Sequence, residues 1–215
     1  MNQRTNKTLV SLGMSCQTTH QLRRLTQDYS GTPSGLFDWL ICPPASTAHL
    51  LDKRIPDFTR NSIQVHKGRA YWAEYNLYLW HSFLITTDDG RCLEINETFE
   101  KELERWRYLR SRFSTLDPQQ TVFIISNTQN NLETEVFNES ESDQYHFTQT
   151  ILDDLRQSLA DYFNTSTDEI NLEVITKEGR SSDLKESPSV TFLPLDRNEW
   201  KGSDKSWDRW WQQLN

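Results

Sequence analysis

The sequence has few cysteines, no excess of positive charge and no long apolar run, and each absence excludes a class of protein. Its three cysteines, Cys16, Cys42 and Cys92, show no CxxC pair and no Cys/His spacing typical of zinc, so neither a disulfide framework nor a metal site is expected. The net charge is −8, from 23 basic and 31 acidic residues, whereas nucleic-acid binding needs a basic surface. The chain has neither 18 consecutive apolar residues nor an apolar segment near its first residue. We therefore expect a cytoplasmic protein with no nucleic-acid partner, no membrane partner and no cofactor.

Aromatic residues are abundant. Of the 215 residues, 35% are hydrophobic and 12% are aromatic, with eight tryptophans among them. This length fits one domain that buries about 70% of the surface of its unfolded chain. Large rings must supply much of that core, and such a content of rings is not typical of a disordered chain. We therefore expect one folded domain spanning residues 1–215.

The beginning of the chain predicts a strand, a tight turn and a helix. Residues 8–12 (TLVSL) predict a short buried strand, which Gly13 ends. Residues 15–26 predict a helix with Ser15 as its N-cap. The next segment, SGTPSGLFDWLICPP, predicts a loop with a packed apolar centre, and residues 46–55 predict a short helix.

The middle of the chain changes from an alternating pattern to a helical one. Apolar residues at the odd positions from Tyr71 to Ile85 predict a strand, or a strand broken near Asn76. Asp89-Gly90 predicts the turn of a hairpin with the following RCLEI. Large apolar residues at helical spacing predict a helix over residues 99–113, whose acidic beginning and arginine-rich end match the helix dipole.

The second half predicts strands that alternate with helices. The expected strands are 121–126, 171–176 and 190–195, and the expected helices are 143–163 and 207–214. This order predicts an α/β layered domain with a mainly parallel central sheet flanked by helices. The region around residues 71–95 adds a β-hairpin. The acidic, polar segment 127–143 predicts a mobile surface loop that buries little apolar surface.

Cys16 is the candidate nucleophile. A thiol in the first turn of a helix faces unpaired N–H groups and the positive end of the dipole, which favours the thiolate. The same N–H groups could hold an oxyanion. The other interpretation is a small buried apolar side chain, a common role for free cysteine. If Cys16 is the nucleophile, it is expected to react with iodoacetamide faster than Cys42 and Cys92, which we interpret as structural.

His81 is the candidate base among five histidines. The alternation places it on the apolar face of a predicted strand, where a ring can be held rigidly. His20 would share the helix of Cys16, but the helix N-terminus disfavours an imidazolium there. The remaining histidines, His49, His66 and His146, are predicted to be solvated.

Four short motifs follow one another along the chain: SLGMSCQTTHQLRRL, GLFDWL, WHSF and NEWKGSDKSWDRWW. Together they resemble those of a bacterial family of papain-like cysteine peptidases, which is a domain of unknown function. The resemblance is strongest over residues 9–40 and 79–113. It implies a nucleophile at Cys16 and a general base at His81, in the Cys-before-His order of papain-like enzymes. The resemblance implies a cysteine nucleophile with a histidine base, but not the papain topology. A papain core begins with its catalytic helix, whereas this chain begins with a predicted strand.

The chain departs from the family pattern at two positions. Leu36 stands where the family usually has proline before Phe-Asp-Trp, and Ser82 stands where it usually has aspartate after the histidine. Neighbouring residues of a strand point to opposite faces, so residue 82 could not orient His81. Asp38, which lies between two aromatic residues, is the candidate third member of the triad, with an ordinary turn or helix cap as its other interpretation. Asn127, at the carboxyl end of a predicted strand, is the alternative orienting residue.

Two functions remain open from the sequence. The first is a cysteine hydrolase or acyltransferase acting on an acyl or peptide substrate, which could be a peptidase, amidase, thioesterase or transferase. The second is a catalytically inert binding or scaffold domain of the same fold. The sequence predicts no oligomeric state.

Overall fold

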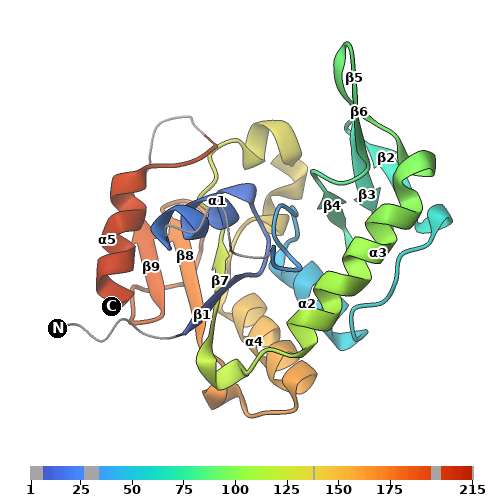
Figure 1. Ribbon diagram of the computed structural model, residues 1–215. Coiled ribbons are helices and arrows are strands. Elements are labelled where there is room, and N and C mark those ends of the chain that lie inside the picture. Colours follow the sequence, from blue (N-terminus) through green and yellow to red (C-terminus); the bar gives the residue numbers. More distant parts are fainter. Residues whose placement is uncertain (1–6, 27–33, 138, 195–199, 215) are drawn as a thin grey trace.

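A four-stranded parallel sheet forms the centre of the computed structural model, which describes residues 7–26, 34–137, 139–194 and 200–214 (Figure 1). The strand order is β1-β7-β8-β9, and every neighbouring pair is parallel. The strands are β1 (Thr8–Ser11), β7 (Thr121–Ser126), β8 (Leu172–Lys177) and β9 (Val190–Leu193). The predicted α/β class with a mainly parallel sheet is confirmed.

Helices cover both faces of this sheet. The helices are α1 (Cys16–Leu25), α2 (Pro44–Asp52), α4 (Gln149–Phe163) and α5 (Asp204–Leu214). Neighbouring side chains of a strand point to opposite faces, so β7 contributes to two apolar clusters. Val122 and Ile124 pack with Trp207 and Trp210 of α5 and with Leu22 of α1. The other cluster joins the opposite face of β7 to α2 and α4, which contact each other.

A second, antiparallel layer lies beside the parallel sheet and is backed by the long helix α3 (Figure 1). Its strands are β2 (Ile63–His66), β3 (Arg69–Trp72) and β4 (Leu77–Leu79), and α3 is Ile95–Ser114. The hairpin of β5 (Leu84–Thr87) and β6 (Gly90–Leu93) projects from this part of the molecule. It confirms the predicted hairpin, although its turn is Asp88-Asp89 rather than Asp89-Gly90. β2 was not predicted.

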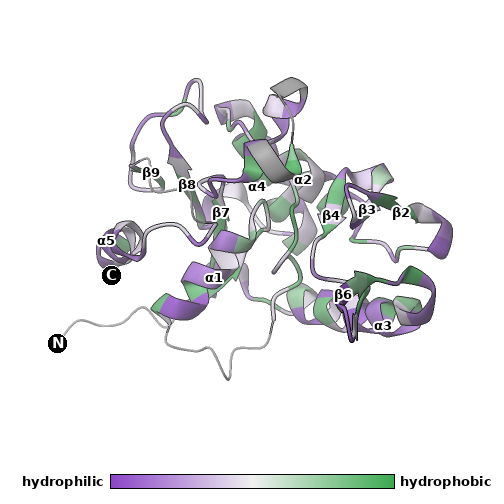
Figure 2. Ribbon diagram, turned by 90° about the horizontal axis from the view of Figure 1, so that it is seen from above, coloured by the Kyte–Doolittle hydropathy of each residue, from purple (hydrophilic) through white to green (hydrophobic). Residues whose placement is uncertain are grey.

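The helical pattern of α3 is confirmed in detail. Its predicted apolar stripe is buried along the whole helix, and it consists of Phe99, Leu103, Trp106, Leu109 and Phe113. Figure 2 shows hydrophilic and hydrophobic residues together on α1, α3 and α5, as expected for helices that bury one side. Within the described ranges, no helix combines the length and the apolar composition needed to cross a membrane.

The prediction of a strand over residues 71–85 is only partly right. The chain breaks at Asn76, where φ is +46°, as the broken-strand alternative predicted. It breaks a second time between β4 and β5, because residues 80–83 form a turn in which the Ser82 N–H donates to the carbonyl oxygen of Leu79 (3.1 Å). His81 therefore lies in an exposed turn and not on the apolar face of a strand. Neighbouring side chains point to opposite faces in a strand, but residues 81 and 82 lie in a turn. The alternation therefore does not exclude residue 82 as an orienting residue.

The prediction of a mobile loop over residues 127–143 is wrong for much of the segment. Leu132 and Val136, the ends of a short π-helical turn, are fully buried, and Phe137 is almost fully buried. A short 3-10 segment, Glu139–Gln144, follows. The average composition of residues 127–143 is polar and acidic, but the segment contains a few apolar residues. Leu132, Val136 and Phe137 pack into the core and anchor it.

Candidate functional site

Cys16 is the first residue of α1 and follows a tight turn at the carboxyl end of β1. Gly13 has φ +84°, and a Cβ there would lie 3.0 Å from the Cβ of Cys42, so glycine is required. Met14 also has positive φ, +65°, which is rare for a side chain of this kind. The Met14 N–H donates to the carbonyl oxygen of Cys42 (2.9 Å), which holds the turn against the loop 34–42. The predicted strand, turn and helix are thus confirmed.

A buried polar network fixes the first turn of α1 to the end of β7. The Ser15 hydroxyl donates to the carbonyl oxygen of Ser126 (3.3 Å), and its oxygen does not accept a capping hydrogen bond from a backbone N–H of its own helix. Gln17 accepts a hydrogen bond from the Thr128 hydroxyl, and its backbone N–H donates to the side-chain oxygen of Gln129 (3.2 Å). One N–H group that could have held an oxyanion is therefore already used.

The environment of Cys16 disfavours the thiolate. The residue is only 4% exposed, and burial raises the pKa of its thiol to about 12. The positive charge of Arg69 and the backbone N–H of Cys16 oppose this effect, and the negative charge of Asp38 adds to it. With a pKa of about 12, on the order of one thiol in 100,000 is ionised at pH 7. Burial thus outweighs the helix N-terminus in this conformation.

The three cysteines differ in accessibility. Cys92 is exposed on the hairpin, whereas Cys42 is fully buried and accepts a hydrogen bond from the Thr47 hydroxyl (3.2 Å). The structural interpretation of Cys92 stays a prediction, but its thiol is open to reagents from solution. The expectation that Cys16 reacts faster than both others overlooked this difference, because access and thiolate character together control alkylation.

Asp38 lies near Cys16 but is bound to other groups. Its carboxylate accepts hydrogen bonds from the Gly35 N–H (2.8 Å), the Thr19 hydroxyl of α1 (3.2 Å) and the Arg23 guanidinium (3.2 Å). Burial raises the pKa of this carboxyl, and the Gly35 N–H and the charge of Arg23 act in the opposite direction. Within the described part of the chain, no hydrogen bond joins Asp38 to His81. The orienting role of Asp38 stays a prediction, and the carboxylate holds the loop on α1.

His81 packs against the residue that follows Asp38. The rings of His81 and Trp39 meet edge to face, with centroids 5.5 Å apart. Although the residue is exposed, its ring is partly desolvated, and this desolvation and the positive charges of Arg69, Arg91 and Arg105 lower the pKa of His81 below its ordinary value. The ring is therefore mostly neutral at pH 7, the form that can accept a proton. Among the described residues, no hydrogen bond joins His81 to Cys16.

Arg69 connects the two candidate residues electrostatically. Its charge lowers the pKa of both the Cys16 thiol and the His81 ring. Its guanidinium lies 4.8 Å from the centre of the Trp80 ring, next to His81 in sequence. Cys16, Asp38, Arg69 and His81 thus belong to one region of the molecule, although they come from four different segments.

Unusual backbone angles flank the three predicted site residues. Met14, Trp39 and Phe83 all have φ between +61° and +65°. They lie within two residues of Cys16, Asp38 and His81. Bulky residues with such angles are rare, and strained backbone is concentrated at functional sites. Five further described non-glycine residues with positive φ lie elsewhere, so these angles agree with the predicted site without singling it out.

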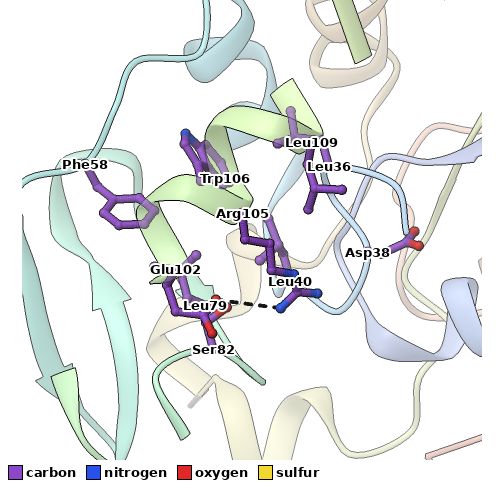
Figure 3. A pocket seen from close by; sticks show the side chains of 10 residues that line it. All are labelled: Leu36, Asp38, Leu40, Phe58, Leu79, Ser82, Glu102, Arg105, Trp106 and Leu109. Atoms are coloured by element: carbon purple, nitrogen blue, oxygen red, sulfur yellow. Dashed lines mark ion pairs between the residues drawn. The ribbon is translucent and has the colours of Figure 1, made fainter. Parts of the chain in front are cut away.

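A small pocket lies between α3 and the loop of Asp38 (Figure 3). Its cavity volume of about 20 Å³ suffices for about one water molecule, whereas ligand pockets are typically several hundred Å³. An ion pair between Arg105 and Glu102 (3.6 Å) forms part of its wall. In Figure 3 the carboxylate of Asp38 points away from Arg105. This pocket is therefore too small to be a preformed substrate site.

Asn127 occupies a structural position at the carboxyl end of β7. Its amide group donates to the carbonyl oxygens of Tyr145 (2.8 Å) and Arg180 (2.9 Å), and its side-chain oxygen is buried without a hydrogen-bond partner. Arg180 is 1% exposed and donates to the carbonyl oxygens of Asn127 and Gln129, as well as to Glu133 (2.7 Å). These bonds tie Asn127 into the core. Its alternative role as orienting residue stays a prediction.

Replacing Arg180 with methionine is expected to reduce the free energy of unfolding by about 2 kcal/mol, because two buried carbonyl oxygens lose their donor while the side-chain volume is kept. Chemical denaturation measures this change. Glu133→Gln is the matched control, since the Glu133 side chain is 45% exposed and its ion pair contributes little. Equal losses in the two variants would contradict the dominant role of the carbonyl bonds.

Sequence reasoning missed Arg69 and the polar network around Gln17. Arg69 could have been noticed, because alternation along β3 places it on the same face as Tyr71, away from the core residues Ala70 and Trp72. The contact between Gln17 and Gln129 has no such signal, since it joins residues far apart in the chain.

Comparison of the chain with protein-family models, with curated proteins and with solved structures finds no match. The implied likeness to papain-like peptidases therefore stays a prediction. Within the described ranges, no group of three or more His, Cys, Asp or Glu side chains is arranged to hold a metal ion.

Proposed function

We propose that this chain is a cysteine-dependent acyl-transfer enzyme, a hydrolase or acyltransferase with papain-like chemistry, in which Cys16 is the nucleophile and His81 the general base. The observation that carries the proposal is the position of Cys16 as first residue of α1, directly after a strained turn at the carboxyl end of β1. A nucleophile on a sharp turn between strand and helix recurs in α/β enzymes. The neutral His81 and the positive charge of Arg69 add support.

The reaction proceeds in two steps. His81 takes the proton of the Cys16 thiol while the sulfur attacks the carbonyl carbon of the substrate. The leaving group departs with that proton, and a thioester on Cys16 remains. Water or another acceptor then attacks the thioester, gives a proton back through His81, and the free thiol returns. The first step requires the turn of His81 to move toward Cys16, and catalytic hydrogen bonds often form only when substrate is bound.

The burial of Cys16 favours a second candidate function. With the thiol 4% exposed and its pKa about 12, the same fold could serve as an inert binding or scaffold domain. In that function Arg23 and Asp38 hold the loop on α1, and Cys16 is a small core residue. The two functions differ in whether Cys16 can form a thioester.

Covalent trapping tests the proposal. When the full chain is incubated with a panel of p-nitrophenyl esters, we expect a mass increase of one acyl group, located on the peptide that contains Cys16. Cys92→Ser, the matched control, removes the most exposed thiol and should keep the adduct. Cys16→Ser should abolish it, because a serine hydroxyl is a far weaker nucleophile without strong activation. An adduct that disappears in Cys92→Ser and persists in Cys16→Ser would refute the proposal.

A further inference from the structure

Arg69 is a half-buried arginine without an acidic partner. Its guanidinium stacks on Trp80, and among the described residues its side chain takes part in no ion pair and no hydrogen bond. Two other arginines of this region are paired: Arg23 with Asp38 (3.2 Å) and Arg105 with Glu102 (3.6 Å). A guanidinium that lies over an aromatic ring can still present its N–H groups to a carboxylate.

The surroundings of Arg69 are positive although the chain as a whole carries a charge of −8. Arg91, exposed on β6, and Arg105 act on His81 together with Arg69. Nearby carboxylates are bound to other cations, and Glu102 is paired with Arg105. Asp38 is bound to Arg23, and Glu141, which acts on Tyr71 and Tyr78, is bound to Lys67 (3.2 Å). Arg69, whose charge acts on both Cys16 and His81, is thus left without an acidic partner among the described residues.

We propose that the acyl substrate of Cys16 carries a carboxylate, which Arg69 binds while the reacting carbonyl lies against the sulfur. This inference rests on the proposed function, because it names the class of substrate for the same site. Arg69 is here a binding residue, and its guanidinium is held over the Trp80 ring. Acidic peptides and acyl groups with a free carboxylate can bind to Arg69 in this way. Neutral acyl groups have no carboxylate for Arg69 to bind.

Two alkylating reagents of nearly equal size test the charge preference directly. Iodoacetate carries a carboxylate and iodoacetamide a neutral amide; with both, a bond forms between sulfur and carbon, iodide leaves and the thiol proton goes to a base. The rate at Cys16 is followed by peptide mass spectrometry on the full chain, and Cys42, which is fully buried, reports any unfolding. We expect Arg69→Gln to lower the ratio of the iodoacetate rate to the iodoacetamide rate about tenfold.

The ratio separates binding of the carboxylate from other effects of Arg69. A change in thiol pKa or in folding alters both rates equally and leaves the ratio unchanged. Arg69→Lys keeps the charge and should retain part of the preference. Arg60→Gln is the matched control: Arg60 also stacks on a ring, 4.4 Å from the centre of Phe99, but pairs with Glu100, and its substitution should leave the ratio unchanged.

The possible failures are distinguishable. Equal ratios in the wild type and Arg69→Gln, with Cys16 labelled in both, would overturn the carboxylate inference and leave the proposed function intact. Absence of labelling at Cys16 by both reagents, or labelling only at the rate of Cys42, would overturn the proposed function and with it this inference.

Discussion

Replacing Phe58 with alanine is expected to reduce the free energy of unfolding by about 4 kcal/mol. Phe58 is 2% exposed and lies at the centre of an aromatic cluster. Its ring centroid lies 5.6 to 5.8 Å from those of four other rings, Trp72, Phe83, Phe99 and Trp106. The substitution leaves a large cavity and removes several edge-to-face contacts, each of which adds to the effect of burial.

Val65→Ala is the matched control for this prediction. Val65 lies on β2 of the same antiparallel layer but is 64% exposed, so its truncation should change the free energy of unfolding by less than about 0.5 kcal/mol. Chemical denaturation of both variants gives the comparison. A loss below about 1 kcal/mol in Phe58→Ala would mean that these rings do not form the core of the layer. Because Phe83 is part of the cluster and lies two residues after His81, Phe58→Ala should also loosen the turn that carries His81.

Much of the fold follows from local patterns in the sequence. The strand at β1, the turn at Gly13 and the helix α1 were predicted because β-branched residues, a glycine and an N-cap position follow one another. The stripe of α3 was predicted because five large residues recur at helical spacing. The last helix was predicted over residues 207–214, and its Trp207 and Trp210 are buried. In each of these elements the local pattern of residues, above all the apolar residues of one buried face, is enough to predict the structure.

The errors occur where contacts between distant segments decide the structure. The strand expected through His81 failed because alternation of apolar residues continued across a turn that only the packing of Phe83 reveals. The segment 127–143 was predicted to be mobile because its average composition is acidic, yet Leu132 and Val136 anchor it. The sequence left two interpretations of Cys16 open, because composition and spacing do not encode its burial.

His81→Gln is expected to slow the alkylation of Cys16 about a hundredfold at pH 7 if His81 is the general base. The neutral ring can accept the thiol proton, whereas the amide of glutamine cannot. The effect on stability should be small, since His81 lies exposed in a turn and loses mainly the contact with Trp39. The melting temperature of the variant checks this second expectation.

His20→Gln is the matched control for a histidine near Cys16. His20 lies on α1, four residues after Cys16, packs against Trp200 (5.3 Å between ring centroids), and burial likewise lowers its pKa. Its substitution should leave the alkylation rate of Cys16 unchanged. A loss as large as that of His81→Gln would transfer the role of base from the turn to the helix.

The pH dependence of Cys16 alkylation by iodoacetamide, measured from pH 4 to pH 10 in the wild type and in His81→Gln, tests the central claim most directly. In the wild type we predict a step with its midpoint below 6.5, because burial and three arginines lower the pKa of His81, followed by a plateau through neutral pH. In His81→Gln the step should disappear, leaving a rate that rises about tenfold per pH unit toward the thiol pKa of about 12. A wild type that shows only this rise, identical to the variant, would contradict the claim that His81 activates Cys16.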